Sequence, residues 1–110
     1  MDKIALVEEQ LKGYNSRDID RFSAVFSDNV TVYSLKEEKV LMQGLAAFRE
    51  SYKKLFDESP NLNAKISHRS SVGDFVIDHE EVSGRRNQTL QAVAIYKITG
   101  DKISHVWFAI

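Results

Sequence analysis

A chain of 110 residues is long enough for one domain and too short for two, so we expect a single domain spanning residues 1–110. The absence of cysteine excludes disulfides and thiolate metal sites. The 15 Lys and Arg residues nearly balance the 16 Asp and Glu residues, which gives no support for nucleic acid as a partner. No apolar run approaches the ~20 residues of a membrane span, and the acidic start "MDKIALVEEQ" is unlike a secretory leader. We therefore expect a soluble cytoplasmic protein without a membrane partner.

The first predicted helix lies in "DKIALVEEQLKGY", where apolar side chains recur with the period of a helix. Asp2 is placed to cap its start, and Gly13 with Asn15 marks its expected end. The apolar stripe of this helix consists of Ile4, Val7, Leu11 and Tyr14.

A shorter helix is predicted in "DIDRFSAVF", with Asp18 as its N-cap. Two short strands follow in "VTVYSL" and "KVLMQ", and a third helix is predicted in "GLAAFRESYKKLF". Pro60 lies just beyond this helix, where a helix does not easily continue. The helical stripes place four phenylalanines in the expected core: Phe22, Phe26, Phe48 and Phe56.

From Leu62 the hydrophobic pattern changes to the two-residue period of a strand. Gly73 can adopt the positive φ of a two-residue hairpin turn between the first two of these strands. Early helices followed by a meander predict an α+β domain, with three helices packed on one face of a curved, mainly antiparallel sheet. Such a concave sheet encloses a pocket. The predicted strands span about 62–72, 75–83, 89–98 and 102–110.

The order of these elements, together with "YNSRDIDRFSAVFSDNVTVYSL", "GLAAFRESY" and "DKISHVWF", resembles the nuclear transport factor 2-like superfamily. Within it, the chain is similar to the SnoaL-like and ketosteroid isomerase-like proteins. The resemblance covers essentially the whole chain and implies a cone-shaped barrel, often a homodimer formed through the outer face of the sheet. Members include isomerases, cyclases, dehydratases, non-catalytic binders and transport adaptors, so the fold does not settle the function.

The catalytic positions of the ketosteroid isomerases carry other residues in this chain. By the resemblance, the general base falls on Ser34, the hydroxyl donor of the first helix on Gln10, and the protonated aspartate on or near Ala94. Because all three positions differ, the isomerase mechanism is not carried over. We therefore expect a hollow whose lining lacks acidic catalysts.

His79 is then the candidate catalytic residue. If the turn at Gly73 has two residues, His68 lies directly opposite His79 and shares its face. The resemblance places Phe75, Ile77 and His79 inside, where apolar neighbours bias a histidine toward the neutral form that suits a general base. The alternative is that both histidines are satisfied polar residues near the rim of the barrel.

The segment "DHEE" (78–81) also permits a metal interpretation. His79, Glu81 and His68 match the two-histidine, one-carboxylate set used by non-haem iron. We favour a solvated Glu81 at the point where the strand leaves the barrel, and we predict neither a metal nor another cofactor.

The expected ligand is a small, mostly apolar molecule oriented by a few polar groups. Tyr14 matches a cavity-lining position of the family that the chain resembles, and Tyr96 shares a face with Ala94. The predicted pocket consists of Tyr14, Ser34, Tyr52, His68, Ile77, His79, Ala94, Tyr96 and Phe108.

The last strand has two possible registers. A two-residue turn at Gly100 and Asp101 sends His105 and Trp107 inward, whereas the resemblance places Val106, Phe108 and Ile110 inward. We favour the second register because its inward set is entirely apolar. His105 and Trp107 would then contribute to a dimer surface, where aromatic residues are enriched.

Three functions remain open at this point. The leading one is a small homodimer whose pocket binds a small-molecule ligand. The second is an isomerase or lyase with His79 as general base. The third is a non-catalytic interaction or dimerisation module whose pocket is filled by packed side chains.

Overall fold

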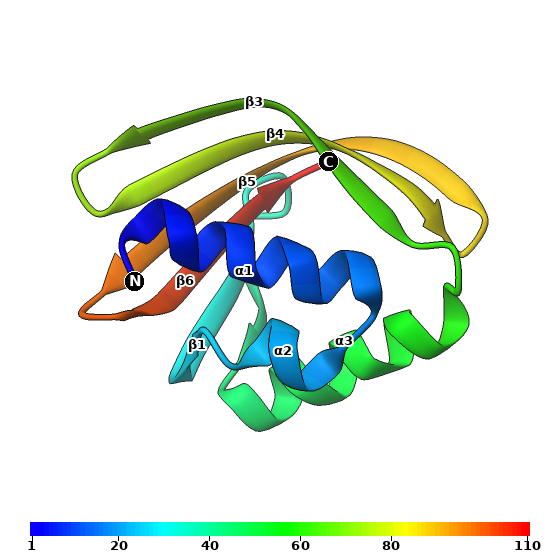
Figure 1. Cartoon of the computed structure of the whole chain (residues 1–110), viewed down its shortest axis with the longest axis horizontal. Helices are drawn as coiled ribbons and strands as arrows, with labels where there is room; N and C mark the ends of the chain where they lie inside the picture. Colours follow the sequence, from blue (N-terminus) through cyan, green and yellow to red (C-terminus); the bar gives the residue numbers. More distant parts are fainter.

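A computed structural model describes residues 1–110 as three helices and a single six-stranded sheet (Figure 1). The helices are α1 (Lys3–Ser16), α2 (Ile19–Ser23) and α3 (Leu45–Glu58). The strands are β1 (Phe26–Ser34), β2 (Lys39–Gln43), β3 (Asn63–Val72), β4 (Phe75–Arg85), β5 (Gln88–Thr99) and β6 (Lys102–Ala109). Their order in the sheet is β2-β1-β6-β5-β4-β3, and the only parallel pair is β1 with β6.

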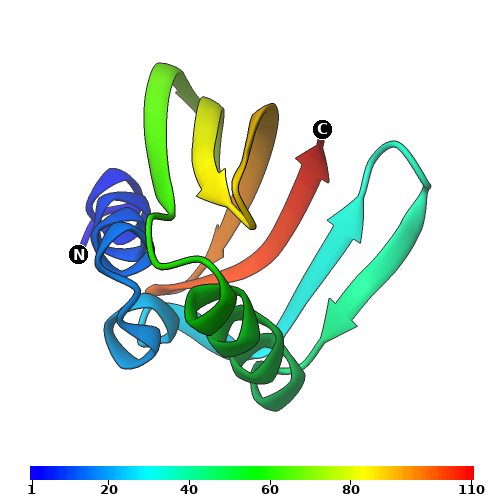
Figure 2. The same ribbon diagram turned by 90° about the vertical axis from the view of Figure 1, so that its right-hand side faces the viewer.

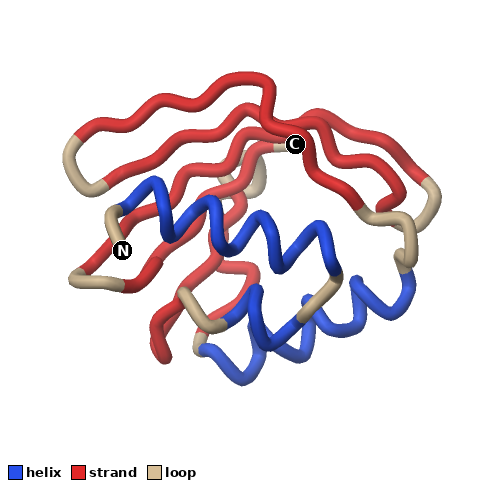
Figure 3. Tube along the Cα trace, viewed as in Figure 1, coloured by secondary structure: helices blue, strands red, loops and turns tan.

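The sheet curls, and the helices lie on its concave side. Figure 2 shows β3, β4 and β5 on one side of the curl and β1 and β2 on the other, with α1 and α3 along the open side. The trace coloured by secondary structure shows the same division into a strand layer and a helix layer (Figure 3). The predicted α+β architecture is therefore confirmed. No helix is long and apolar enough to cross a lipid bilayer.

The ends of the first two helices follow from capping and close packing. The side chain of Asp2 accepts a hydrogen bond from the Ala5 amide (2.8 Å), and that of Asp18 accepts one from the Arg21 amide (3.1 Å), as predicted. Helix α1 ends at Ser16, one residue beyond Asn15 of the predicted end, so Gly13 lies inside the helix rather than at its terminus. Gly13 instead allows α2 to approach, since a Cβ atom there would lie 2.4 Å from the Phe22 amide nitrogen.

An aromatic core joins α2, α3 and β1. The rings of Phe22 and Phe48 stack with their centroids 5.4 Å apart, and Phe26 packs against Phe48 at 4.5 Å. Phe56 is buried in the same cluster, so all four phenylalanines predicted for the core are found there. These ring contacts pack α3 against α2 and the start of β1.

Strand β4 presents its faces in the opposite sense from the prediction. The set buried beneath the helices is Val76, Asp78, Glu80 and Val82. The set on the outer face is Phe75, Ile77, His79 and Glu81. Both alternating sets begin with an apolar residue and contain charged ones, so the period of two does not decide which set is inside. The expectation that Phe75, Ile77 and His79 point inward is therefore wrong.

One bulge sets the register of β6. The turn at Gly100 does have two residues, since Thr99 pairs with Lys102, but Ser104 is an extra residue between the Ile98–Ile103 and Lys97–His105 pairs. The two-residue turn of the first register is therefore present, but the extra residue shifts the pairing beyond it by one. As in the second register, Val106 and Phe108 point inward. At the other hairpin, Gly73 has a φ of +54°, as predicted for its turn.

Candidate functional site

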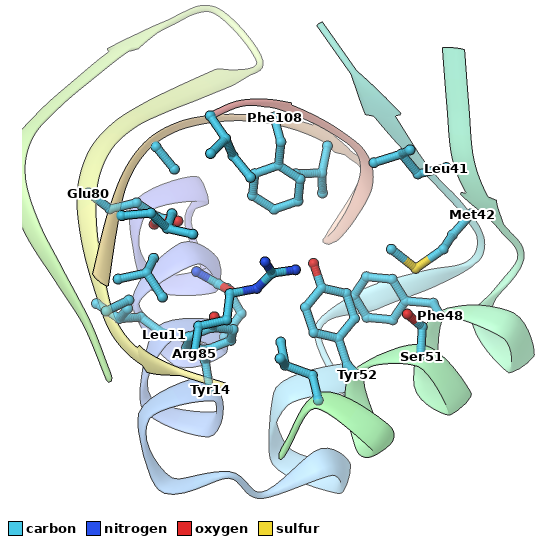
Figure 4. Close-up of a pocket in the computed structure, with 18 of the residues that line it drawn as sticks. Leu11, Tyr14, Leu41, Met42, Phe48, Ser51, Tyr52, Glu80, Arg85 and Phe108 are labelled. Carbon is cyan, nitrogen blue, oxygen red and sulfur yellow. The ribbon is translucent and has the colours of Figure 1, made fainter. Parts of the chain in front are cut away.

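A cavity of about 170 Å³ lies between the concave face of the sheet and helices α1 and α3 (Figure 4). Sixteen of its 21 lining residues are hydrophobic, so its walls suit an apolar molecule. The aliphatic and phenylalanine part of the wall is Leu11, Phe26, Leu41, Met42, Phe48, Leu55, Ala64, Val82, Leu90, Ala92, Val106, Phe108 and Ile110. The remaining lining residues bring hydroxyl, amide and charged groups to the same space.

Three tyrosines and one glutamine supply neutral hydrogen-bonding groups to the cavity. Gln10 on α1 is buried and donates a hydrogen bond from Nε2 to the Tyr96 hydroxyl on β5 (3.2 Å). Burial raises the pKa of the Tyr14, Tyr52 and Tyr96 hydroxyls, and the charge of Glu80 raises these pKa values further. These hydroxyls therefore stay protonated and can donate hydrogen bonds to a bound molecule.

Glu80 is the acidic group of the cavity. It comes from the middle of β4, and its residue is 7% exposed. Its carboxyl forms no hydrogen bond or ion pair with another side chain, and its oxygens keep some accessible surface at the cavity. Burial raises the pKa of Glu80 to about 7; the charge of Asp78 raises it further, while Arg69 lowers it. A carboxyl with this pKa exchanges its proton near neutral pH, which suits a general acid or base.

Asp78 lies two residues earlier on the same face of β4, but it is neutralised. Arg69 on β3 faces Asp78 across the strand pair and binds both of its oxygens, with Nε–Oδ1 at 2.6 Å and Nη2–Oδ2 at 2.9 Å. Arg69 also pairs with Glu8 on α1. The bulge at Ser67 then places Ile66 opposite Glu80, so Glu80 has no arginine across from it.

Arg85 brings a positive charge to the cavity from the end of β4. Its side chain lines the cavity, is half-buried, and forms no ion pair. In Figure 4 its guanidinium extends across the cavity toward the hydroxyl end of Tyr52. The charge of Arg85 lowers the pKa of Tyr52 and of Tyr14, although burial raises both pKa values by more. Arg85 is therefore close enough to both hydroxyls to act on them electrostatically.

The structure brings together only part of the predicted pocket. Tyr14, Tyr52, Tyr96 and Phe108 line the cavity. Ala94 is fully buried in the core but does not line the cavity. The hydroxyl of Ser34 accepts a hydrogen bond from the Glu37 amide (3.0 Å) at the end of β1, which is a structural role in the turn.

The predicted histidine pair exists but lies on the outer face of the sheet. His68 and His79 are cross-strand partners, with ring centroids 6.1 Å apart, and both are exposed. His79 contacts the Gln91 side chain (Nε2–Oε1, 3.0 Å) rather than the cavity. The assignment of His68, Ile77 and His79 to the pocket is therefore wrong. No group of three His, Asp or Glu side chains in the chain is arranged to hold a metal ion.

Sequence reasoning missed Glu80, and it favoured a solvated Arg85 in the hairpin loop over a contact with an anionic ligand. The expectation of a lining without acidic groups is wrong because it followed from the face assigned to β4, and the correct face carries Glu80 inward. A signal for the correct face was present in the segment "DHEEVSGRR". The alternating set that contains Glu80 continues to an apolar residue, Val82, which is buried, whereas the set that contains His79 continues to a serine.

The outer face carries a row of aromatic rings across three strands. Trp107 stacks on Tyr33 with centroids 5.2 Å apart and on His105 at 5.6 Å, and Phe75 packs against it at 6.2 Å. Their outward direction agrees with the register favoured for β6. All four side chains are partly exposed in the single chain.

Residues 7–106 match the model of the SnoaL-like domain. None of the curated proteins matches the chain. Among solved structures, an uncharacterized cystatin-fold protein from Novosphingobium aromaticivorans is 23% identical, with a TM-score of 0.91 and coverage of 100% of this chain and 99% of that one. A nuclear transport factor 2-like protein from Cytophaga hutchinsonii is 13% identical (TM-score 0.84; 99% and 89% covered). A protein of ketosteroid isomerase-like fold from Catenulispora acidiphila, in complex with trimethylamine, is 12% identical (TM-score 0.81; 96% and 84% covered). At these identities the likeness shows a shared fold.

Proposed function

The chain belongs to the SnoaL-like domain family, and on that premise we propose that its cavity binds a small, mostly apolar molecule and that Glu80 exchanges a proton with it. The observation that carries this proposal is the buried Glu80 carboxyl, which faces the cavity without a partner in the chain. Burying such a group costs free energy, and a ligand that hydrogen-bonds to it would recover part of that cost.

The volume of the cavity matches a molecule of about one ring. Its volume of about 170 Å³ is close to the ~150 Å³ of an engineered protein cavity that accepts benzene, and it lies below the ~300 Å³ at which typical drug-sized sites begin. The structure from Catenulispora acidiphila is a complex with trimethylamine, a molecule of few atoms. That comparison supports a small ligand for this fold.

The surrounding groups favour proton transfer at carbon next to a carbonyl. The Glu80 carboxylate would remove the proton and return it to the same molecule, as a base and then an acid. A tyrosine hydroxyl, Tyr14 or Tyr52, would donate a hydrogen bond to the oxygen on which negative charge develops. This is isomerase-like chemistry with Glu80 in the role that the sequence assigned to His79.

The direct test is the exchange of α-protons of cyclohexanone in D₂O, followed by proton NMR. We expect the protein to accelerate exchange, and we expect Glu80→Gln to reduce the acceleration by about 100-fold or more. Glu81→Gln is the matched control, because Glu81 is the next residue on β4 and lies exposed on the outer face. Equal losses in both variants, or no acceleration by the unsubstituted protein, would contradict proton transfer by Glu80.

A binding protein without turnover is the second candidate for the cavity, and the same variants separate it from the enzyme. A binder predicts that cyclohexanone saturates the protein in NMR titrations while exchange stays at the solvent rate. In that case Glu80→Gln changes only the affinity for cyclohexanone. The leading proposal requires both that cyclohexanone saturates the protein and that its α-protons exchange faster than in solvent alone.

We also propose that the protein forms a homodimer through the aromatic row of Tyr33, Phe75, His105 and Trp107. The supporting observation is that these rings are stacked on one another yet partly exposed, and aromatic residues are enriched in interfaces. Native mass spectrometry should report a dimer, and Trp107→Lys should convert it to a monomer. A monomer before substitution would contradict this surface.

A further inference from the structure

Arg85 differs from the other arginines near the cavity in lacking a partner. Arg69 is committed to Asp78 and Glu8, and Arg86 forms an ion pair with Glu58 (Nη2–Oε1, 3.1 Å). Arg85 has no ion pair, although it is half-buried and lines a largely apolar cavity. A half-buried guanidinium is stabilised most by an anion that accepts several of its hydrogen bonds at once.

The backbone that carries Arg85 is fixed against the loop between α3 and β3. Gly84 has a φ of +69°, and a Cβ atom there would lie 2.2 Å from the Asn61 carbonyl oxygen, so only glycine allows this contact. The Arg86 amide donates a hydrogen bond to the Ser59 hydroxyl (3.0 Å). These contacts hold the base of the Arg85 side chain in place, and a recognition group on a fixed base loses less entropy on binding.

The two charges of the cavity are separate from each other. Glu80 and Arg85 do not form an ion pair, and the pKa of Glu80 is set by burial, Asp78 and Arg69 rather than by Arg85. Arg85 acts instead on the hydroxyls of Tyr14 and Tyr52. Figure 4 shows Arg85 directed toward Tyr52, with Glu80 on the wall formed by the sheet. A ligand therefore meets a positive group and an acidic group at different places.

Building on the proposed function, we propose that the ligand is a small carboxylic acid whose carboxylate binds Arg85 and the Tyr52 hydroxyl, while its apolar body places a carbonyl near Glu80. The planar guanidinium matches a carboxylate with two parallel hydrogen bonds, and the protonated Tyr52 hydroxyl can add a third. Tyr14 is then the tyrosine that donates to the carbonyl oxygen near Glu80. A single ring or an equivalent short chain fills the apolar space between the two ends.

Other ligand charges fit the same groups less well. A cationic ligand would approach Glu80 favourably but would meet the unpaired charge of Arg85 in a cavity of about 170 Å³. A phosphate dianion would need more positive groups than the single free arginine provides. A neutral ligand would leave the Arg85 guanidinium without an acceptor.

The probes for this proposal are 4-oxocyclohexanecarboxylate, cyclohexanone and cyclohexylamine, which share one ring and differ in charge. Binding is measured by NMR titration at pH 7. We expect the oxo acid to bind at least about tenfold more tightly than cyclohexanone, because it adds charged hydrogen bonds. Arg85→Gln should reduce this preference by about tenfold or more, and Arg85→Lys should retain part of it. Arg49→Gln, which removes a charge paired with Asp20 on the surface, should leave the preference unchanged.

The outcomes separate this inference from the function on which it rests. If cyclohexanone binds and exchanges in a Glu80-dependent way but the oxo acid shows no preference, the inference is overturned and the proposed function stands. Tighter binding of cyclohexylamine than of the oxo acid would also overturn it. If none of the three probes binds, the proposed function itself fails. Circular dichroism of each variant shows whether it is folded before its affinity is compared.

Discussion

Glu80 and Glu81 are neighbours on β4, yet they lie on opposite faces of the sheet. Glu80 is 7% exposed beneath the helices and lines the cavity, whereas Glu81 is exposed and accepts a hydrogen bond from Gln91 (3.2 Å). Burial and the charge of Asp78 raise the pKa of Glu80 to about 7. Two residues of the same type on β4 therefore differ in burial and in hydrogen bonding because they lie on different faces of the sheet.

The two faces also differ in how their polar groups are satisfied. On the outer face, His79 contacts Gln91, and His68 Nδ1 contacts the Ser67 carbonyl oxygen at 2.8 Å. On the inner face, Asp78 has its arginine, whereas the Glu80 carboxyl forms no hydrogen bond or ion pair with another side chain and opens onto the cavity. A polar group that already has a hydrogen-bond partner in the protein gains little free energy from a ligand. Ligand binding is therefore favoured on the inner face, where Glu80 lacks such a partner.

The largest expected effect comes from breaking the ion pair of the inner face. Arg69→Met should lower the free energy of unfolding by about 3–5 kcal/mol, because it leaves the fully buried Asp78 carboxylate without its partner. The double variant Arg69→Met with Asp78→Leu should lose less, since it removes both charges together. Urea unfolding measures both values. A double variant less stable than the single one would mean that Asp78 does not need Arg69.

A surface pair provides the control for this comparison. Arg21→Met removes the ion pair with Glu9, whose side chains are 43% and 26% exposed. The expected loss of unfolding free energy is much smaller than at Arg69, because solvent screens exposed charges. Equal losses at Arg21 and Arg69 would show that burial on the concave side does not strengthen the dependence on a partner.

Sequence patterns sufficed for the architecture because capping residues, helical stripes and turn glycines act locally. Asp2, Asp18 and Gly73 each do what their local sequence predicts. The site depended on non-local features. The inward face of β4 is decided by which residues meet α1 and α3, and the register of β6 is decided by one bulge at Ser104. Neither feature leaves a periodic signal in the sequence. The sequence therefore favours His79 as the catalytic residue, whereas the structure places Glu80 in the cavity.

The next effect concerns the pH dependence of stability. The pKa of Glu80 rises from 4.5 to about 7 on folding, so the folded protein keeps a proton that the unfolded chain loses above pH 4.5. The free energy of unfolding should therefore fall as pH rises from about 4.5 to about 7, by up to about 3 kcal/mol from this group. Glu80→Gln cannot ionise, so it should be more stable than the unsubstituted protein at pH 8 and nearly equal to it at pH 4.5.

Urea unfolding at several pH values gives this difference directly, because the other titrating groups are common to both proteins. Glu81→Gln is again the control, and its stability relative to the unsubstituted protein should show no such slope. A Glu80→Gln protein that is less stable at pH 8 would mean that the carboxylate has a stabilising partner, and the argument for an unsatisfied acid in the cavity would fail.

The smallest expected effect is at His79, the residue that the sequence favoured. His79→Ala should change the free energy of unfolding by no more than about 0.5 kcal/mol, because the side chain is exposed and its contact with Gln91 lies on the surface. It should also leave the exchange of cyclohexanone α-protons at the rate of the unsubstituted protein. Each result follows from the outward direction of this side chain. If His79→Ala abolished exchange while Glu80→Gln preserved it, the reactive face would be the outer one, and the contrast between the two faces would have to be reversed.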